Sequence, residues 1–474
     1  MKDDKINNVR VRFAPSPTGH LHIGSLRTAL FNWLFARHHK GTFLVRVEDT
    51  DRQRSTKEFE ESIMQSLEWT GLVADEPVVY QYDRLNIHIK AIDRLVQEGK
   101  AYKCFCPEKE LAQKKEKAIF SQNTYQYDKT CRVLPEDQTN KDQPYVVRFK
   151  ADVADETFVF HDAVKGEVSI PSEQIDDFIV VRSDQTATYN LAVVQDDHDM
   201  NITHVIRGED HLINTVKQIL LYRALGYKEP IFAHIPLILG SSGQKLSKRD
   251  AITSVVKYKE QGYLADALCN YLVRLGWSHK DQEIFTMDQM VELFSLKHVH
   301  KSGAKFDTEK LNWMNGVYIK GKTVSELLDL FAQNLSADIV TKTPDWKDKV
   351  REDWILLYQD RVDTIQELYD MVLQAYSLPV TYDWDALNKI IAKESIVILQ
   401  LLQQEFEGVV FEKEKILALV KAFCKAYDYK MSKVSQLLRF ALLGKVSGPS
   451  VFDMMVLFGK QEVHKRISHV IALF

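Results

Sequence analysis

The sequence predicts an α/β fold in its first half and an all-α second half. The stretch "VRVRF" (residues 9–13) alternates apolar and basic residues, as a strand does. Apolar residues recur at helical spacing through residues 26–34, and "TFLVRV" (residues 42–47) is typical of a second strand. This order forms a βαβ unit, which implies a parallel sheet. Beyond about Asn315, segments such as "EKILALVKAFCKAY" place apolar residues three and four apart, as amphipathic helices do.

The pattern changes between Lys103 and about Ser183. Short strand-like runs ("YVVRF", "TFVF", "FIVVR") alternate there with polar loops, which indicates an insertion into the α/β half. From "ATYNLAVVQDD" onward the buried strand and helix patterns return, and they continue through "HVIRGED", "TVKQILLYRALG" and "AHIPLILG". The α/β domain is therefore expected in two pieces on either side of the insertion.

Composition indicates an enzyme-sized cytoplasmic protein. The chain has 474 residues, a formal net charge of −4 and 45% hydrophobic residues, without an apolar run long enough for a membrane span. The first residues lack the apolar core of a signal peptide. The five cysteines therefore favour reduced thiols or a metal over a disulfide framework. An acidic total does not exclude a local basic surface for nucleic acid.

The first motif is a turn that carries two histidines. In "RFAPSPTGHLHIGS" (residues 12–25), His20 and His22 precede Gly24 at the start of the predicted helix. Unpaired N–H groups at a helix N-terminus favour an anion, and glycine lets a ligand approach the backbone. The carboxyl ends of parallel strands are also the expected ligand site. The motif is typical of a phosphate cradle, although by itself it also fits an ordinary turn with two surface histidines.

The second motif is a loop of small and basic residues. "GSSGQKLSKRDA" (residues 240–251) follows the predicted strand "AHIPLILG". Lysines on a mobile loop can close over a polyphosphate and stabilise the charge that develops as pyrophosphate leaves. The similar "KMSKV" (residues 430–434) follows neither a buried strand nor a glycine loop, so we interpret it as a chance match.

Together the two motifs resemble the signatures of class I aminoacyl-tRNA synthetases, with "HIGS" where that family often has His-Ile-Gly-His and with "KLSKR" as the second signature. The stretches "FLVRVEDTD", "VIRGEDHL" and "LLRFALLGKVSGPSVFDMMVLFGK" narrow the resemblance to bacterial-type glutamyl-tRNA synthetases, and it covers the whole chain. It implies a Rossmann-like catalytic domain with an inserted subdomain, followed by an all-α anticodon-binding half. The expected parts are the first half of the catalytic domain (1–103), the inserted acceptor-binding subdomain (104–188), the second catalytic half (189–250), a helical stem-contact region (251–320) and the anticodon-binding region (321–474).

The resemblance also implies the substrates and the residues that hold them. Glutamate carries two carboxylates, which arginine binds better than lysine, and its ammonium group needs an anion. The expected glutamate-binding residues are Arg12, Ala14, Ser16, Glu48, Tyr189, Asn190 and Arg207. How Arg12 and Arg207 divide the two carboxylates stays open. The expected ATP-binding residues are His20, His22, Gly24, Asp210, His211, Lys245, Ser247 and Lys248, of which His20, His22, Lys245 and Lys248 are the catalytic candidates.

The implied reaction forms glutamyl-adenylate from ATP and then esterifies the 3' end of tRNA(Glu). Neither step needs a protein nucleophile, so catalysis depends on positioning and on charge stabilisation. Mg²⁺ is expected with the ATP phosphates. Relatives generally need bound tRNA before they activate glutamate, and we expect a monomer that has no membrane contact.

A cluster of cysteines lies in the insertion. Cys104 and Cys106 are followed by Cys131, and thiolates favour zinc. Some glutamyl-tRNA synthetases hold zinc here with a Cys-x-Cys and Tyr-x-x-x-Cys pattern, which Tyr127 completes; Val133 excludes the histidine of other relatives. The cluster is thus a possible zinc site, with three reduced thiols as the alternative. Cys269 and Cys424 lie on apolar helix faces and are expected in the core.

The resemblance leaves several alternatives to a tRNA(Glu)-specific enzyme. Arg439 and "GKVSGPS" resemble anticodon-side elements, but they do not say whether tRNA(Gln) is also glutamylated. Glutaminyl-tRNA synthetase shares the signatures but has a β-barrel C-terminal half, which the helical pattern disfavours. A short glutamylating paralogue and a nucleotidylyltransferase would not need the helical half. A non-catalytic tRNA-binding protein would be expected to lose Arg12, His22 or Lys248, and all three are present.

Overall fold

The computed structural model describes residues 8–51, 54–120, 125–133, 143–153, 155–246, 254–334, 352–375, 377–390 and 394–473. Ser247 and Lys248 lie outside these ranges. The chain forms two units. The first consists of Met1–Tyr258 and Ala265–Thr308, and the second of Lys259–Leu264 and Glu309–Phe474.

The first unit is built on parallel strands. β1 (Arg10–Phe13), β2 (Thr42–Val47) and β3 (Val79–Tyr80) pair in parallel, and a second set runs in the order β7 (Gly166–Pro171), β6 (Thr157–Asp162), β10 (Ile231–Ile235), β9 (His204–Gly208). Only β7 is antiparallel to its neighbour. β9 lies beside β1, where the N–H of Thr203 donates to the carbonyl oxygen of Arg10 at 2.9 Å. The predicted βαβ unit and parallel arrangement are therefore confirmed.

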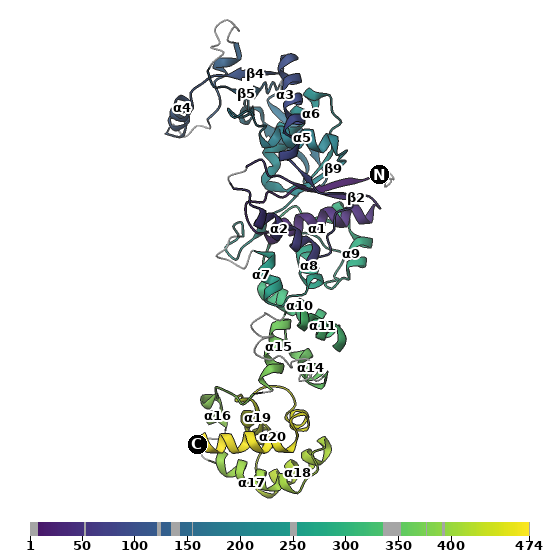
Figure 1. Cartoon of the computed structure of the whole chain (residues 1–474), viewed down its shortest axis with the longest axis vertical. Helices are drawn as coiled ribbons and strands as arrows, with labels where there is room; N and C mark the ends of the chain where they lie inside the picture. The colour runs from purple at the N-terminus through teal and green to yellow at the C-terminus, as the bar shows by residue number, and fades with distance from the viewer. Residues whose placement is uncertain are drawn as a thin grey trace. The chain divides into compact units, whose positions relative to one another are not determined.

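Helices cover both faces of these strands (Figure 1). α1 (Ile23–His38) contacts β1, β2 and β9 on one face and packs against α8 (Ala265–Arg274) and α9 (Met287–Leu293). This explains why nearly all its apolar residues are buried. On the other face α3 (Leu85–Gln97), α5 (Tyr189–Asp199) and α6 (Leu212–Leu225) share one apolar core with Leu44 of β2 and Val205 of β9. Because helices cover both faces, the strand ends are the place for a ligand.

The segment predicted as an insertion contributes to two sheets. β4 (Ala101–Cys104), β5 (Val146–Phe149) and β8 (Ile179–Val181) form a separate antiparallel sheet. β6 and β7, from the same segment, instead extend the strands of β9 and β10. The remaining elements of the first unit are α2 (Lys57–Trp69), α4 (Glu108–Phe120), α7 (Val255–Glu260), β11 (Ile238–Leu239) and β12 (Ala304–Lys305).

The described part of the second unit is helical, as the sequence predicts (Figure 1). Its helices are α10 (Thr308–Lys320), α11 (Val324–Asn334), α14 (Glu352–Tyr358), α15 (Ile365–Gln374), α16 (Trp384–Ile390), α17 (Ser395–Glu407), α18 (Lys413–Ala426), α19 (Met431–Leu443) and α20 (Val451–Leu473). The "KMSKV" segment begins α19, with Lys430 at its N-cap. It is therefore the start of a helix in a helical unit, unlike the glycine loop after β11.

Within the described ranges, none of the helices combines the length and apolar character needed to cross a membrane.

Candidate active site

A cavity of about 670 Å³ opens at the carboxyl ends of β1, β2, β9 and β10. This is where a parallel sheet of this kind binds its ligands. Residues just beyond the strands form much of its wall. The predicted site residues in its lining are Arg12, Ala14, Ser16, His22, Gly24, Glu48, Tyr189, Arg207, Asp210, His211 and Lys245.

A buried carboxylate holds Arg12 at the cavity. The Nε of Arg12 donates to Oδ1 of Asp197 on α5 at 3.0 Å. The same oxygen accepts from Nη1 of Arg46 at 2.5 Å, and Nη2 of Arg46 donates to Oε1 of Glu48 at 3.2 Å. Burial by itself would raise the pKa of Asp197, but the charges of Arg12 and Arg46 outweigh it and hold that pKa below its ordinary value. Burial raises the pKa of Glu48, against the opposing charges of Arg46 and Arg12.

Arg207 brings a second buried cation to the same cavity. It lies near the end of β9, and its Nη2 donates to Oγ1 of Thr215 at 2.7 Å. Its Nη1 is buried and has no hydrogen-bond partner among the described residues. Burial lowers the pKa of this guanidinium below its ordinary value. A buried donor without a partner is costly, so a ligand acceptor in the cavity would relieve the penalty.

Tyr189 and His211 form a polar pair in the wall. The phenol oxygen of Tyr189 lies 3.2 Å from Nδ1 of His211. Burial first, and the charge of Arg207 second, lower the pKa of His211 to about 4. Burial also raises the pKa of Tyr189. Both groups are therefore neutral near pH 7 and act as hydrogen-bonding groups rather than charges.

The two signature segments meet at this cavity. His22 caps α1, because its Nδ1 accepts from the N–H of Gly24 at 3.0 Å. Lys245 pairs with Leu239 next to β11, and Ser254, on the far side of the lysine loop, pairs with His22. The Nζ of Lys245 donates to Oδ2 of Asp210 at 3.1 Å. Lys245 thus lies in the same cavity wall as His22, and Ser254 lies beside the histidine turn.

Of the predicted glutamate- and ATP-binding residues that the structure describes, His20 and Asn190 do not line the cavity. His20 is exposed, and its Nδ1 lies 2.9 Å from Oγ of Ser62 while its ring contacts the edge of Phe59, both on α2. Asn190 accepts a hydrogen bond from Nε2 of Gln218 at 3.2 Å. Each side chain is directed to a neighbouring helix, which its position in the sequence did not indicate.

The structure adds polar residues to the cavity that the motifs did not single out. They include Arg27, Thr28 and Asn214. Arg27 is buried and donates from Nη1 to the carbonyl oxygen of Leu275 at 2.9 Å, and burial lowers its pKa to about 10. The sequence could have indicated two of them. Arg27 and Thr28 stand three and four residues after Gly24, which places them near the helix face that reaches the cavity.

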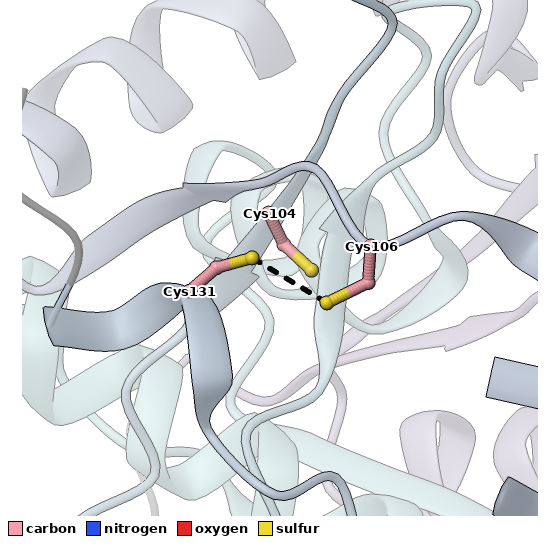
Figure 2. A group of neighbouring side chains, drawn as sticks. All are labelled: Cys104, Cys106 and Cys131. Carbon is pink, nitrogen blue, oxygen red and sulfur yellow. Dashed lines mark hydrogen bonds between the residues drawn. The ribbon is translucent and has the colours of Figure 1, made fainter. Parts of the chain in front are cut away.

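The three cysteines of the insertion converge as their spacing suggested (Figure 2). Their sulfur atoms all lie within 4.8 Å of one another, and Sγ of Cys106 lies 3.4 Å from Sγ of Cys131. The hydroxyl of Tyr127 lies 3.3 Å from Sγ of Cys104 and 3.4 Å from Sγ of Cys106. The Nε of Arg148 donates to Sγ of Cys104 at 3.4 Å. Three sulfurs and one oxygen around one point form a donor set that could hold a metal. Cys269 and Cys424 are buried, as expected of core residues.

In the second unit, Arg439 supports the loop that follows α19. Its Nε donates to the carbonyl oxygen of Pro449 at 2.8 Å and its Nη1 to that of Val446 at 3.5 Å, so the guanidinium joins two residues of "GKVSGPS". Burial lowers the pKa of Arg439, and the charge of Arg361 adds to this effect. Its side chain therefore has a structural contact in addition to any contact with nucleic acid.

Comparisons with known proteins agree with this geometry. Residues 8–313 match the model of "tRNA synthetases class I (E and Q), catalytic domain", and residues 323–471 match "Anticodon binding domain". The chain is 44% identical to glutamate–tRNA ligase of Syntrophotalea carbinolica over 98% of each chain. It is 42% identical to that of Thermodesulfovibrio yellowstonii over 98% of this chain and 99% of the relative. A crystal structure of a glutamate tRNA ligase from Elizabethkingia meningosepticum in complex with its amino acid superposes with a TM-score of 0.86, at 35% identity, covering 98% of this chain and 99% of that one.

Matches to the catalytic and anticodon-binding domain models, with 42–44% identity over 98% of the chain, show that the chain belongs to the glutamate–tRNA ligases, within the class I tRNA synthetases.

Proposed function

We propose that this ligase activates glutamate in the cavity at the ends of β1 and β9. One observation carries the proposal: two buried arginines, Arg12 and Arg207, line the same cavity as the carboxylate of Glu48 and as Lys245 of the signature loop. The arginines match the two carboxylates of glutamate, and Glu48 matches its ammonium group. Ala14, Ser16 and Tyr189 complete the proposed pocket, and Asn190, which accepts from Gln218, would support it from outside the lining.

ATP would lie between the histidine turn and the lysine loop, with its Mg²⁺ as part of the substrate. His22, Gly24, Asp210, His211 and Lys245 line this part of the cavity. An oxygen of the glutamate α-carboxylate attacks the α-phosphorus, the bond to pyrophosphate breaks, and an acyl phosphate forms. Lys245 and Lys248 would stabilise the leaving pyrophosphate. His20, whose ring contacts α2, would support the turn rather than bind ATP itself.

The second step transfers the glutamyl group to tRNA. The 3'-terminal ribose hydroxyl attacks the acyl carbon, AMP leaves, and the hydroxyl proton passes to an oxygen of the adenylate phosphate. We assign the acceptor end to the segment 104–188 and the anticodon to the region 321–474, with 251–320 along the stem; Arg439 would order the anticodon-side loop. The match of residues 323–471 to an anticodon-binding domain supports the second assignment.

Charging assays test this function directly. With ATP, we expect glutamate to be attached to tRNA(Glu) and glutamine to be rejected, because a neutral amide leaves a buried guanidinium without its anion. Glutamylation of tRNA(Gln) at a comparable rate would identify a non-discriminating enzyme. Attachment of glutamine would instead favour a glutaminyl enzyme. We also propose a cytoplasmic monomer; light scattering should give about 54.8 kDa.

We further propose that Cys104, Cys106, Cys131 and Tyr127 bind zinc in a structural site. The support is the convergence of their donor atoms and the guanidinium of Arg148 beside Cys104, which favours a thiolate. Zinc bound there would join β4 to the segment around Cys131. Metal analysis of protein purified without chelator should give near-stoichiometric zinc, and Cys106→Ser should lose it. Metal-free protein with three titratable thiols would contradict the site, and Cys424→Ser is the matched control.

A further inference from the structure

A chain of buried polar side chains leads away from Arg207, on the side opposite its unpartnered nitrogen. The Nε of Arg207 donates to Nε2 of His234 at 3.2 Å. His234 stands directly beside Arg207 in the register of β10 and β9. The Nδ1 of His234 lies 2.6 Å from Oδ2 of Asp162, the last residue of β6. All three side chains are buried, with exposed fractions of 5% for Arg207 and 0% for the other two.

The carboxylate of Asp162 determines the tautomer of His234. Its Oδ1 accepts from the N–H groups of Val164 at 2.9 Å and Lys165 at 2.8 Å, and both of its oxygens face the N–H of His234. Burial by itself would raise the pKa of Asp162, but the hydrogen bonds from the His234 side chain and from these N–H groups outweigh it and keep that pKa below its ordinary value. An ionised carboxylate can only accept, so Nδ1 of His234 carries the proton and Nε2 is left as an acceptor. Burial lowers the pKa of His234 in spite of Asp162, which keeps the ring neutral near pH 7.

We propose that Asp162 and His234 are positioning residues that orient Arg207 toward one carboxylate of glutamate. This inference rests on the proposed glutamate pocket. The acceptor at Nε2 of His234 and the hydroxyl of Thr215 engage Nε and Nη2 of Arg207, which leaves Nη1 for the ligand. Neither Asp162 nor His234 lies in a signature motif, and neither is in the cavity lining.

An asparagine at position 162 should disturb this arrangement while it preserves shape. An amide has one acceptor oxygen and one donor nitrogen, but every neighbour of Asp162 is a donor. If the amide oxygen keeps the bonds to Val164 and Lys165, its nitrogen faces Nδ1 of His234 and favours the other tautomer. The Nε2 of His234 would then carry a hydrogen, which Oγ1 of Thr215 at 2.9 Å can accept, but the Nε–H of Arg207 would face a second donor and lose the acceptor that orients it.

The test measures tRNA-dependent ATP–pyrophosphate exchange on the full chain in a double-mutant cycle. We expect Asp162→Asn to lower kcat/KM for glutamate about 30-fold while the KM for ATP stays within about twofold. In an Arg207→Gln background, adding Asp162→Asn should lower kcat/KM for glutamate by less than about threefold, because Asp162 acts through Arg207. Equal losses in both backgrounds, or an equal effect on the KM for ATP, would overturn the proposal.

Two further variants keep the test independent of folding. His234→Asn retains a donor toward Asp162 and removes the acceptor for Arg207, so it should show the same selective defect for glutamate. Gln195→Leu is the control, because Gln195 is buried, accepts from the hydroxyl of Tyr227 at 2.8 Å and donates to Oδ1 of Asp199 at 3.0 Å, without a bond to Arg207. It should lower thermal stability but leave kcat/KM for glutamate within about twofold. If Arg207→Gln alone leaves that value unchanged, the glutamate pocket itself is wrong; if only the Asp162 and His234 variants are silent, the pocket stands and the positioning pair does not.

Discussion

Asp197 lies 3.0 Å from the Nε of Arg12, and the two side chains form a fully buried ion pair at the wall of the cavity. The same carboxylate oxygen also bonds Arg46, which in turn reaches Glu48. One carboxylate on α5 thus orients both the cation and, through Arg46, the anion proposed to contact glutamate.

Replacing this carboxylate should weaken both stability and glutamate binding. Asp197→Asn removes the charge that two buried guanidinium groups share, and leaving buried charge unpaired typically costs about 3–5 kcal/mol. We expect unfolding free energy to fall by about 3 kcal/mol and KM for glutamate to rise at least about tenfold. Urea unfolding measures the effect on stability, and the kinetics of ATP–pyrophosphate exchange measure the effect on glutamate. Asp199→Asn is the control on the same helix: its partly exposed pair with Arg84 should be worth less than about 1 kcal/mol. Unchanged glutamate kinetics in Asp197→Asn would contradict the idea.

Lys245→Ala should weaken the use of ATP, measured as its KM, more than it lowers the stability of the protein. The ion pair between Lys245 and Asp210 is largely exposed, so its loss should change unfolding free energy by less than about 0.5 kcal/mol. Lys245 lines the cavity next to His22 and Gly24, so we expect the KM for ATP to rise about tenfold while the KM for glutamate changes little. The surface variant Lys228→Ala should leave both constants unchanged. A selective effect on glutamate would place Lys245 in the other half of the cavity.

His204 should make folding sensitive to mild acid. Burial first, and the charge of His39 second, lower the pKa of His204 to about 4 from an ordinary value of 6.5. The unfolded chain then binds a proton that the native state excludes, so stability is complete above pH 6.5 and declines as the pH falls toward 4. The upper limit of this loss is about 3 kcal/mol. Urea unfolding from pH 7 to pH 4.5 should show a shallower decline for His204→Phe than for the parent; identical slopes would show that His204 does not titrate in this way.

Two glycines of the second unit should respond in opposite directions to alanine. Gly444 ends α19 at φ +74°, and a Cβ there would lie 2.3 Å from the carbonyl oxygen of Thr381. Gly444→Ala should therefore destabilise the second unit by more than about 2 kcal/mol. Gly408, at φ −86°, would place a Cβ in open space, and Gly408→Ala should be neutral or stabilising by up to about 1 kcal/mol. Differential scanning calorimetry measures both, and equal melting temperatures for the two variants would contradict the account.

Hydrophobic periodicity predicted most of the helices and strands. The alternation in residues 9–13, the helical spacing through residues 26–34 and the strand-like pattern of residues 42–47 correspond to β1, α1 and β2. Patterns of this kind record which face of an element is buried, and burial dominates local structure. The strand-like runs of residues 104–188 were also present, but periodicity does not say which strand pairs with which. It therefore did not separate β4, β5 and β8 from β6 and β7, which extend another sheet.

The sequence predicted candidate site residues that stand in a motif or at a strand end. It did not predict which neighbour each side chain contacts. Arg12, Glu48, Arg207 and Lys245 stand at strand ends or in signature loops, and they share one cavity. His20 and Asn190 stand in the same motifs, yet their side chains contact α2 and Gln218 instead. One residue of displacement along a turn or a helix rotates a side chain to another neighbour, and no local pattern records that rotation.

The sequence by itself determined the family, the α/β and helical halves, and the kinds of charged groups that an acidic amino acid and a triphosphate require. The tertiary structure alone decided which carboxylate serves which arginine. Asp197 reaches Arg12 and Asp162 reaches Arg207 through His234 across large distances in the chain, because parallel strands and the helices that cover them bring these positions together. Buried charges must find partners wherever packing places them, and packing is a property of the folded chain.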